Sequence, residues 1–460
     1  MGGNVFSPPG PDALNTPRMS PSIYNHVKEQ YTSALKKLGF SRVVTPIEAP
    51  EKDSFGDVDI LVCLEGASFT SNVQLDTSEW DRVEKALKAE RSSSQSRIGP
   101  DKKRIIDSKS FAVPWPAGMG SPGDSKAASG PRFVQVDVRV CDTRQDLEWR
   151  VFKHNHGDLW NMLGQIIRPF GLTADEVGLY LRIPEIERQD KKRARVLLTS
   201  DPTKVSNFLG LSRPKGESEK PFKTVNDLFE HAASCRWFML WPRDQEAEQE
   251  KASDRSRMKQ RPVFKRWVDE FIPACRAKGR FKATNPQQRT PGDVRDEVRK
   301  EAFRAFPGSE AAYNSTLADW NKEKARLFVK NKLIKEDVCL PADITPFLPT
   351  PREHDDGTKA TLHDLERNWR GVLRSALAKV IIDDDATFGS IKPPGLRDAE
   401  GVLDVDRVKE WIDENWKEVG RVAWELNCER SRESVERKRK AAEGAQGVKA
   451  GAGAATGGKR

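Results

Sequence analysis

The pattern of apolar and polar positions divides the 460-residue chain into an N-terminal part, in which helices and strands alternate, and a mostly helical C-terminal part. Apolar residues at helical spacing predict amphipathic helices, whereas alternation with period two predicts strands that bury one face. The predicted strands lie at 42–45, 57–63, 108–113, 133–140, 178–183 and 195–199. The main predicted helices lie at 23–38, 77–91, 146–178, 201–209, 225–238, 263–277, 294–306, 313–332, 362–382 and 405–427.

These elements predict an α+β fold with a mixed sheet and helices, followed by a largely helical C-terminal region. The hydrophobic fraction of 37% is high enough for packed cores, which excludes a wholly disordered chain. The polar stretch 91–104 is expected to form a loop. The expected parts are a flexible N-terminus at 1–20, an α+β domain at 21–145 with a loop insertion at 114–131, a middle α/β region at 146–243, a helical region at 261–428 and a disordered basic Gly/Ala tail at 429–460.

The strongest candidate chemistry lies on two of the predicted strands. Asp57 and Asp59 alternate with apolar residues, so both carboxylates share one face of their strand while the other face enters a core. Asp137 stands in the middle of the later strand 133–140, in the run FVQVDVRV. If the two strands are neighbours, the three carboxylates converge, and such a group can hold two divalent cations about 3.5–4 Å apart. Oxygen ligands of this kind favour Mg²⁺ or Mn²⁺.

The run GDVDILV (56–62) after a helix and a strand, followed by Asp137 on a later strand, resembles the nucleotidyltransferase fold of the DNA polymerase beta superfamily. The resemblance covers about residues 21–145, which it identifies as a nucleotidyltransferase-like domain. It implies an enzyme that moves a nucleotidyl group from an NTP to an acceptor hydroxyl. It also implies that Asp57, Asp59 and Asp137 are the catalytic and metal-ligating residues, with two Mg²⁺ or Mn²⁺ ions as cofactors. One ion would activate the attacking hydroxyl, and the other would hold the triphosphate.

A second resemblance is to uncharacterised, mostly fungal proteins that carry a nucleotidyltransferase-like domain. The shared segments are HGDLWNMLG (156–164), GLYLRI (178–183) and LLTSDPTKVSNFLGL (197–211). This grouping implies no particular substrate.

The chain departs from the superfamily at the position of the phosphate-binding turn. The superfamily usually has a Gly-Ser turn before the first carboxylate, whereas residues 45–50 read TPIEAP. We therefore assign nucleotide binding to Gly56 and to Lys52, which would contact the phosphates as a point charge. The same departure favours an alternative, a noncatalytic scaffold that kept the fold and lost the transfer activity.

The net charge of +9 allows a nucleic-acid partner without requiring one, because residues 429–460 hold nine basic and four acidic side chains and so carry about half of the excess. In the rest of the chain, basic residues gather between 255 and 266. They are either a solvated helix and loop or the floor of a nucleic-acid-binding module. The candidate contacts are Arg255, Arg257, Lys259, Arg261, Lys265 and Arg266. The expected partners are thus an NTP and, as one candidate acceptor, RNA or DNA.

Several other classes of protein and site are not expected. No run of about eighteen apolar residues occurs, so we expect neither a transmembrane helix nor a membrane partner. The start MGGNVFSPPG lacks the features of a secretory signal. The six cysteines form no CxxC pair, which favours a reducing compartment, the cytoplasm or the nucleus. His154, His156 and Asp158 fit no common zinc motif, and we expect the last two to cap the helix that follows.

Overall fold

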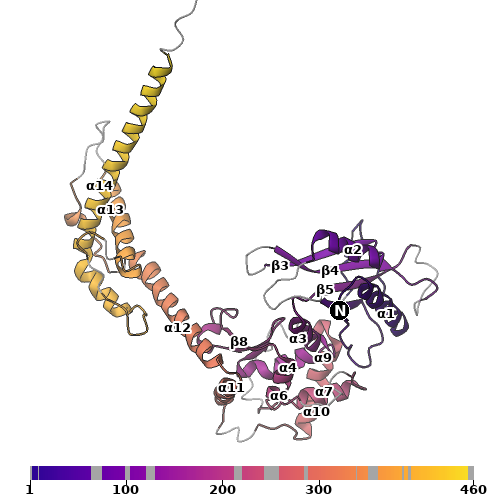
Figure 1. The fold of residues 1–460 in the computed structure, drawn as a ribbon. Coiled ribbons are helices and arrows are strands. Elements are labelled where there is room, and N and C mark those ends of the chain that lie inside the picture. Colours follow the sequence, from indigo (N-terminus) through magenta and orange to yellow (C-terminus); the bar gives the residue numbers. More distant parts are fainter. Residues whose placement is uncertain are drawn as a thin grey trace, which may run out of the picture. The chain divides into compact units, whose positions relative to one another are not determined.

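The computed structural model describes residues 3–8, 10–63, 75–98, 104–120, 130–211, 220–242, 258–283, 289–337, 339–350, 361–385, 388–391 and 395–453. The chain divides into two compact units, Met1–Tyr313 and Asn314–Arg460. Figure 1 shows the elements of both units, coloured along the sequence. Each unit is described by itself below.

The first unit opens with a five-stranded mixed sheet in the order β1-β2-β5-β4-β3. Strands β2 and β5 are parallel, and all other neighbours are antiparallel. The α+β fold expected from the sequence is confirmed. The strands are β1 (Arg42–Val44), β2 (Asp57–Cys63), β3 (Arg91–Ile98), β4 (Arg104–Pro114) and β5 (Phe133–Val140).

One face of this sheet is buried beneath two helices, α1 (Pro21–Lys37) and α2 (Thr77–Leu87). The apolar residues that alternate along β2 and β5, such as Val58 and Val136, are fully buried in this core. Burial of such side chains stabilises the fold by about 1.5–3 kcal/mol each. The opposite face of the two strands is therefore left for the polar residues in between.

Strand β3 occupies a stretch that the sequence pattern predicts as a loop, so that prediction was wrong. Its sequence, RSSSQSRI, has no apolar alternation, and its side chains are exposed or half-buried. The strand forms because its backbone pairs with β4 along its whole length, with an irregularity between Gln95 and Ser96. Backbone pairing of this kind leaves no period-two signal in the sequence.

The segment before α1, expected to be flexible, is held on the sheet. Phe6 is 4% exposed and packs against Ala112 and Phe133. Met19 and Phe55 exchange two backbone hydrogen bonds, of 2.8 and 3.0 Å. These contacts fix the chain from residue 3 to α1, apart from position 9, which lies outside the described residues.

The remainder of the first unit is a layer of short helices and a small antiparallel sheet in the order β6-β7-β8. Helices α9 and α10 join through the π-helical segment η2, whose Trp267 is fully buried. The elements are α3 (Arg144–His154), α4 (Leu159–Ile167), η1 (Arg168–Phe170), β6 (Leu172–Ala174), β7 (Leu179–Arg182), α5 (Pro184–Glu187), β8 (Arg195–Thr199), α6 (Pro202–Leu209), α7 (Val225–Ala233), α9 (Pro262–Arg266), η2 (Trp267–Phe271), α10 (Ile272–Ala277) and α11 (Pro291–Ala305).

All regular elements among the described residues of the second unit are helices, which confirms the expected helical C-terminal region. Its core includes Trp369 and Trp416, whose rings meet edge to face at 6.0 Å. The elements are η3 (Val329–Ile334), η4 (Thr345–Phe347), α13 (Leu362–Leu377), η5 (Ala378–Ile382) and α14 (Val405–Gly453), and helix α12 (Ser309–Phe328) spans the boundary between the units.

Helix α14 extends well past residue 427, where the apolar pattern ends. The structure differs here from the disordered tail expected at 429–460, because the helix continues to Gly453. Residues after 428 are rich in Glu, Arg, Lys and Ala, which are strong helix formers, and Glu436 pairs with Lys440 at 2.8 Å. Across the described residues, none of the helices combines the length and the hydropathy needed to cross a bilayer.

Candidate functional site

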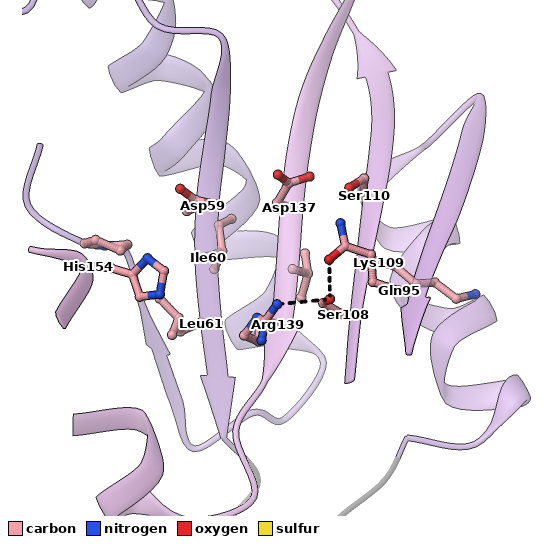
Figure 2. A pocket seen from close by; sticks show the side chains of 12 residues that line it. Asp59, Ile60, Leu61, Gln95, Ser108, Lys109, Ser110, Asp137, Arg139 and His154 are labelled. Atoms are coloured by element: carbon pink, nitrogen blue, oxygen red, sulfur yellow. Dashed lines mark hydrogen bonds between the residues drawn. The ribbon is translucent and has the colours of Figure 1, made fainter. Parts of the chain in front are cut away.

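The structure places the three predicted aspartates on neighbouring strands. In the parallel register of β2 and β5, Asp59 stands directly opposite Asp137, and Asp57 stands opposite Gln135. All of these residues alternate with buried valine and isoleucine, so they share the face of the sheet that α1 and α2 leave uncovered. Figure 2 shows Asp59 and Asp137 on this face. The two strands, β2 and β5, are therefore neighbours in the sheet, as the convergence of the carboxylates requires.

The three carboxylates have raised pKa values, chiefly because they are buried. Burial, followed by the charge of Asp137, raises the pKa of Asp57 to about 6. Burial, followed by the charges of Asp57 and Asp137, raises the pKa of Asp59 to about 7, although its side chain still reaches solvent in the cleft. Burial also raises the pKa of Asp137. Raised pKa values of this kind mark a cluster that favours a proton or another cation.

A fourth carboxylate, which the sequence analysis missed, belongs to the same cluster. Glu48 adds to the charge that raises the pKa values of the two β2 aspartates. Its side chain accepts a hydrogen bond of 2.9 Å from Tyr24. It also forms an ion pair of 2.5 Å with Lys52. Lys52, our predicted phosphate contact, therefore lies beside the carboxylates, where its charge lowers the pKa of Asp57, but it is paired with Glu48.

Gly56, the second predicted nucleotide contact, lies against the N-terminal segment of the chain. A Cβ atom added to Gly3 would lie 2.1 Å from the carbonyl oxygen of Gly56, and Gly3 itself has φ +89°. The backbone of the two glycines is thus in close contact beside Asp57. This approach gives a structural reason for the glycine at position 3.

A pocket of about 110 Å³ opens beside Asp59 and Asp137 (Figure 2). Beyond the carboxylates, its polar lining comes from β3, β4 and β5, and His154 at the end of α3 contributes from the other side. The lining is Pro46, Asp59, Ile60, Leu61, Gln95, Ser108, Lys109, Ser110, Asp137, Val138, Arg139 and His154. Because of this lining, a molecule that enters the pocket meets hydrogen-bond donors and acceptors next to the carboxylates.

The pocket's polar groups contact one another only weakly at its far end. Ser108 lies 3.5 Å from the amide oxygen of Gln95 and 3.5 Å from the guanidinium of Arg139. Arg139 also has a long ion pair of 3.7 Å with Asp107. Contacts at these distances are weak, so the groups can turn toward a bound molecule.

The start of the HGDLWNMLG segment supports the loop that carries Glu48. The backbone N–H of His156 donates to the carbonyl of Ile47 at 2.6 Å, and the Asn155 side chain accepts from the N–H of Ile47 at 2.8 Å. Gly157, at φ +61°, lies against Ala49 so closely that a Cβ atom would be 2.8 Å from it. These contacts fix residues 47–49 in front of β2.

The capping role expected for His156 and Asp158 is not what the structure contains. Asp158 occupies the position before α4, but its side chain makes no capping hydrogen bond there. It accepts instead from the guanidinium of Arg261 at 2.8 Å and from the backbone N–H of Phe264 at 3.2 Å. Asp158 therefore ties α4 to α9, two elements about a hundred residues apart.

The predicted basic cluster is largely neutralised by carboxylates. Arg255 and Arg257 lie outside the described residues, and Lys259 is exposed. The other three members each have an acidic partner within 3.3 Å: Arg261 with Asp158, Lys265 with Asp269, and Arg266 with Glu270. This balance favours the solvated-helix interpretation over an electrostatic floor for nucleic acid.

The carboxylates do not form a ready-made metal cage. Among the residues with described positions, no group of three or more His, Cys, Asp or Glu side chains is arranged to hold a metal ion. Asp137 accepts from Gln135, whose Nε2 lies 3.0 Å from both of its carboxylate oxygens. The donor set itself, oxygen atoms on rigid strands with raised pKa values, fits a hard divalent cation.

Comparisons with known proteins add little to these observations. No protein-family model matches the chain, and no curated protein matches it. Among solved structures, it is similar to Leishmania infantum polymerase beta in a ternary P/T complex, with 17% identity over 45% of this chain and 77% of that chain, and a TM-score of 0.29. The same polymerase in a ternary gap complex gives 16% identity, 45% and 71% coverage, and a TM-score of 0.29.

Proposed function

We propose that the chain is a metal-dependent nucleotidyltransferase that moves a nucleotidyl group from an NTP to an acceptor hydroxyl. The observation that carries this proposal is the register of β2 and β5, which sets Asp59 opposite Asp137 with Asp57 on the same face. Three carboxylates on adjacent strands, with raised pKa values and an open pocket beside them, suit a reaction that cations assist. The six cysteines are free, which supports action in a reducing compartment, the cytoplasm or the nucleus.

In this proposal Asp57, Asp59 and Asp137 hold Mg²⁺ or Mn²⁺. When bound, the ions would lower the pKa of the acceptor hydroxyl and stabilise the leaving pyrophosphate. Lys52 contributes a positive charge beside Asp57 for the phosphates of the NTP, and Glu48 keeps that charge in place. Ser110 and Gln135 fix the orientation of Asp137 through hydrogen bonds.

The acceptor would reach Asp137 through the pocket of about 110 Å³. That volume suits the end of a molecule rather than a whole nucleotide, since pockets for drug-sized ligands measure roughly 300–1,000 Å³. The lining residues include no Phe, Tyr or Trp, so they offer hydrogen bonds rather than a surface for base stacking. RNA or DNA is one candidate acceptor, and its terminal hydroxyl would be the attacking group.

The test is release of pyrophosphate from each of the four NTPs with Mn²⁺, measured with RNA, DNA and sugar acceptors. We expect Asp59→Asn and Asp137→Asn to abolish release, and Asp81→Asn, an exposed residue on α2, to leave it unchanged. Equal pyrophosphate release by the wild type and both site variants would refute the proposed transferase activity.

A noncatalytic scaffold is the second candidate, and the Glu48–Lys52 ion pair favours it. A carboxylate in the loop where the superfamily usually holds phosphates repels a polyphosphate. Calorimetric titration with Mn²⁺ and NTP separates the two candidates. Nucleotide binding that depends on Mn²⁺ and on Asp59 supports the transferase, and absence of any nucleotide binding supports the scaffold.

A further inference from the structure

The N-terminal segment crosses β2 and β5 at the point where these strands carry their carboxylates. The backbone N–H of Gly3 donates to Asp57 on β2. Two residues later, the N–H of Val5 donates to the side-chain oxygen of Gln135 on β5, at 3.0 Å. Since Asp57 and Gln135 are register partners, residues 3–5 bridge the two strands at one step of the ladder.

Gln135 in turn donates hydrogen bonds to Asp137. Its Nε2 lies 3.0 Å from both carboxylate oxygens of Asp137. The side chain is 1% exposed, and the N–H of Val5 fixes the amide orientation because only the oxygen can accept from it. A buried amide with both ends satisfied holds its partner in one orientation.

Gly3 is suited to this position in a way that other residues are not. With φ +89° and the carbonyl oxygen of Gly56 at 2.1 Å from its would-be Cβ, it admits no side chain. Phe6 then anchors the segment, buried against Ala112 and Phe133 on the same face of the sheet. The segment thus brings one backbone N–H group to Asp57 and a second to Gln135, which in turn contacts Asp137.

We propose that residues 3–6 form a brace that orients the aspartates for divalent cations, with Gln135 as its positioning residue. The inference rests on the proposed function, because it concerns the same cation site. In metal proteins, hydrogen bonds to the ligands orient them and tune the affinity for the ion. Gln135 and the Gly3 N–H would orient the ligands in this way here. Gly3 lies more than fifty residues before Asp57 in the sequence, and Val5 lies 130 residues before Gln135.

The hydrogen bonds of the brace leave room for a cation. An ionised carboxylate offers about four lone-pair positions. Gln135 and Ser110 take up to three of those on Asp137. At least one position remains toward the pocket, which is enough for single-oxygen ligation. The brace therefore has no need to leave when an ion binds.

The first test compares two glycine substitutions in the same segment. Gly3→Ala forces the segment away from Gly56, whereas Gly10→Ala meets nothing within 4 Å. Calorimetry with Mn²⁺ on the full chain should give roughly tenfold weaker affinity for Gly3→Ala, the range typical of lost ligand support, and no change for Gly10→Ala. Thermal unfolding of both variants checks that they are folded.

A second pair isolates the hydrogen bond to Gln135. Val5→Pro removes the N–H, while Val5→Ala keeps it and removes only part of a side chain that is 38% exposed. We expect Mn²⁺ affinity to fall for Val5→Pro by several-fold and to stay unchanged for Val5→Ala.

The outcomes separate the brace from the proposed function. Unchanged Mn²⁺ affinity in Gly3→Ala and Val5→Pro overturns the brace, even if the wild type transfers nucleotides. Tighter Mn²⁺ binding in these variants also overturns it, because the segment would then be a latch that competes with the ion. Weakened binding together with no transfer by the wild type supports the brace and refutes the enzyme. If the wild type binds no Mn²⁺, both proposals fail.

Discussion

Replacing one of the crowded aspartates should stabilise the metal-free protein at neutral pH. Asp57→Asn is the most informative change, because Asp57 is half-buried and its neighbours are known. Asparagine keeps the shape of the side chain and an oxygen that can still accept from Gly3. It removes only the charge that Asp59, Asp137 and Glu48 repel.

The size of the effect follows from the raised pKa. Folding moves the pKa of Asp57 from an ordinary 3.8 to about 6. At about 1.4 kcal/mol per pKa unit, the ionised group would cost the folded state at most about 3 kcal/mol. Because the side chain is partly exposed, solvent screening reduces this, and we expect a gain of about 1–2 kcal/mol in unfolding free energy for Asp57→Asn. That corresponds to a rise of about 2–4 °C in Tm.

The gain in unfolding free energy for Asp57→Asn must also increase with pH. An acid whose pKa is raised by folding binds more protons in the folded state than in the unfolded state between the two pKa values. The stability of the wild type therefore falls as pH rises from about 4 to about 6, on account of Asp57. The advantage of Asp57→Asn should be small near pH 4, grow up to pH 6 and then stay constant.

Thermal unfolding between pH 4 and 8, in buffers with a chelator, measures this directly. Asp81→Asn, on the exposed side of α2, is the matched control and should show no such trend. If Asp57→Asn is less stable than the wild type at pH 7.5, or if its effect is the same at every pH, the picture of an uncompensated cluster is refuted.

Two further predictions concern the cation and the helical layer. Mn²⁺ affinity, measured by calorimetry, should rise roughly tenfold or more from pH 5.5 to 7.5, because protons compete for carboxylates with pKa values of about 6 and 7; a flat profile would exclude them as ligands. Asp158→Ala should lower the unfolding free energy by about 1–3 kcal/mol in urea titrations, since it leaves the buried N–H of Phe264 unpaired, whereas Arg261 is 45% exposed and can turn to solvent. Lys265→Ala, which loses only an exposed pair with Asp269, should change it by less than about 0.5 kcal/mol.

The sequence predicts the part of the site that lies on regular strands, where polar and apolar residues alternate. Asp57 and Asp59 alternate with buried residues, and Asp137 sits in an equally regular strand. Period-two alternation fixes which residues share a face, so only the pairing of the two strands had to be assumed. The structure supplies that pairing, and with it the α+β fold.

The rest of the site is formed by contacts that have no local periodicity. Glu48 lies in a proline-flanked loop, and its position depends on Asn155 and Gly157 from the turn between α3 and α4, about a hundred residues later. Gln135 looks like any polar residue on a strand until the N–H of Val5 is placed above it.

The electrostatic balance of the site bears on the order in which ligands bind in the proposed reaction. Asp57, Asp59, Asp137 and Glu48 lie close together, and two positive charges act on them: Lys52, which Glu48 already neutralises in part, and Arg139, which lowers the pKa of Asp137. A triphosphate that approached this group without cations would meet net negative charge in a partly buried place, where repulsion is poorly screened. Divalent cations must therefore arrive before the nucleotide or together with it. In the proposed reaction, the ions rather than the loop that carries Glu48 would supply the positive charge for the NTP.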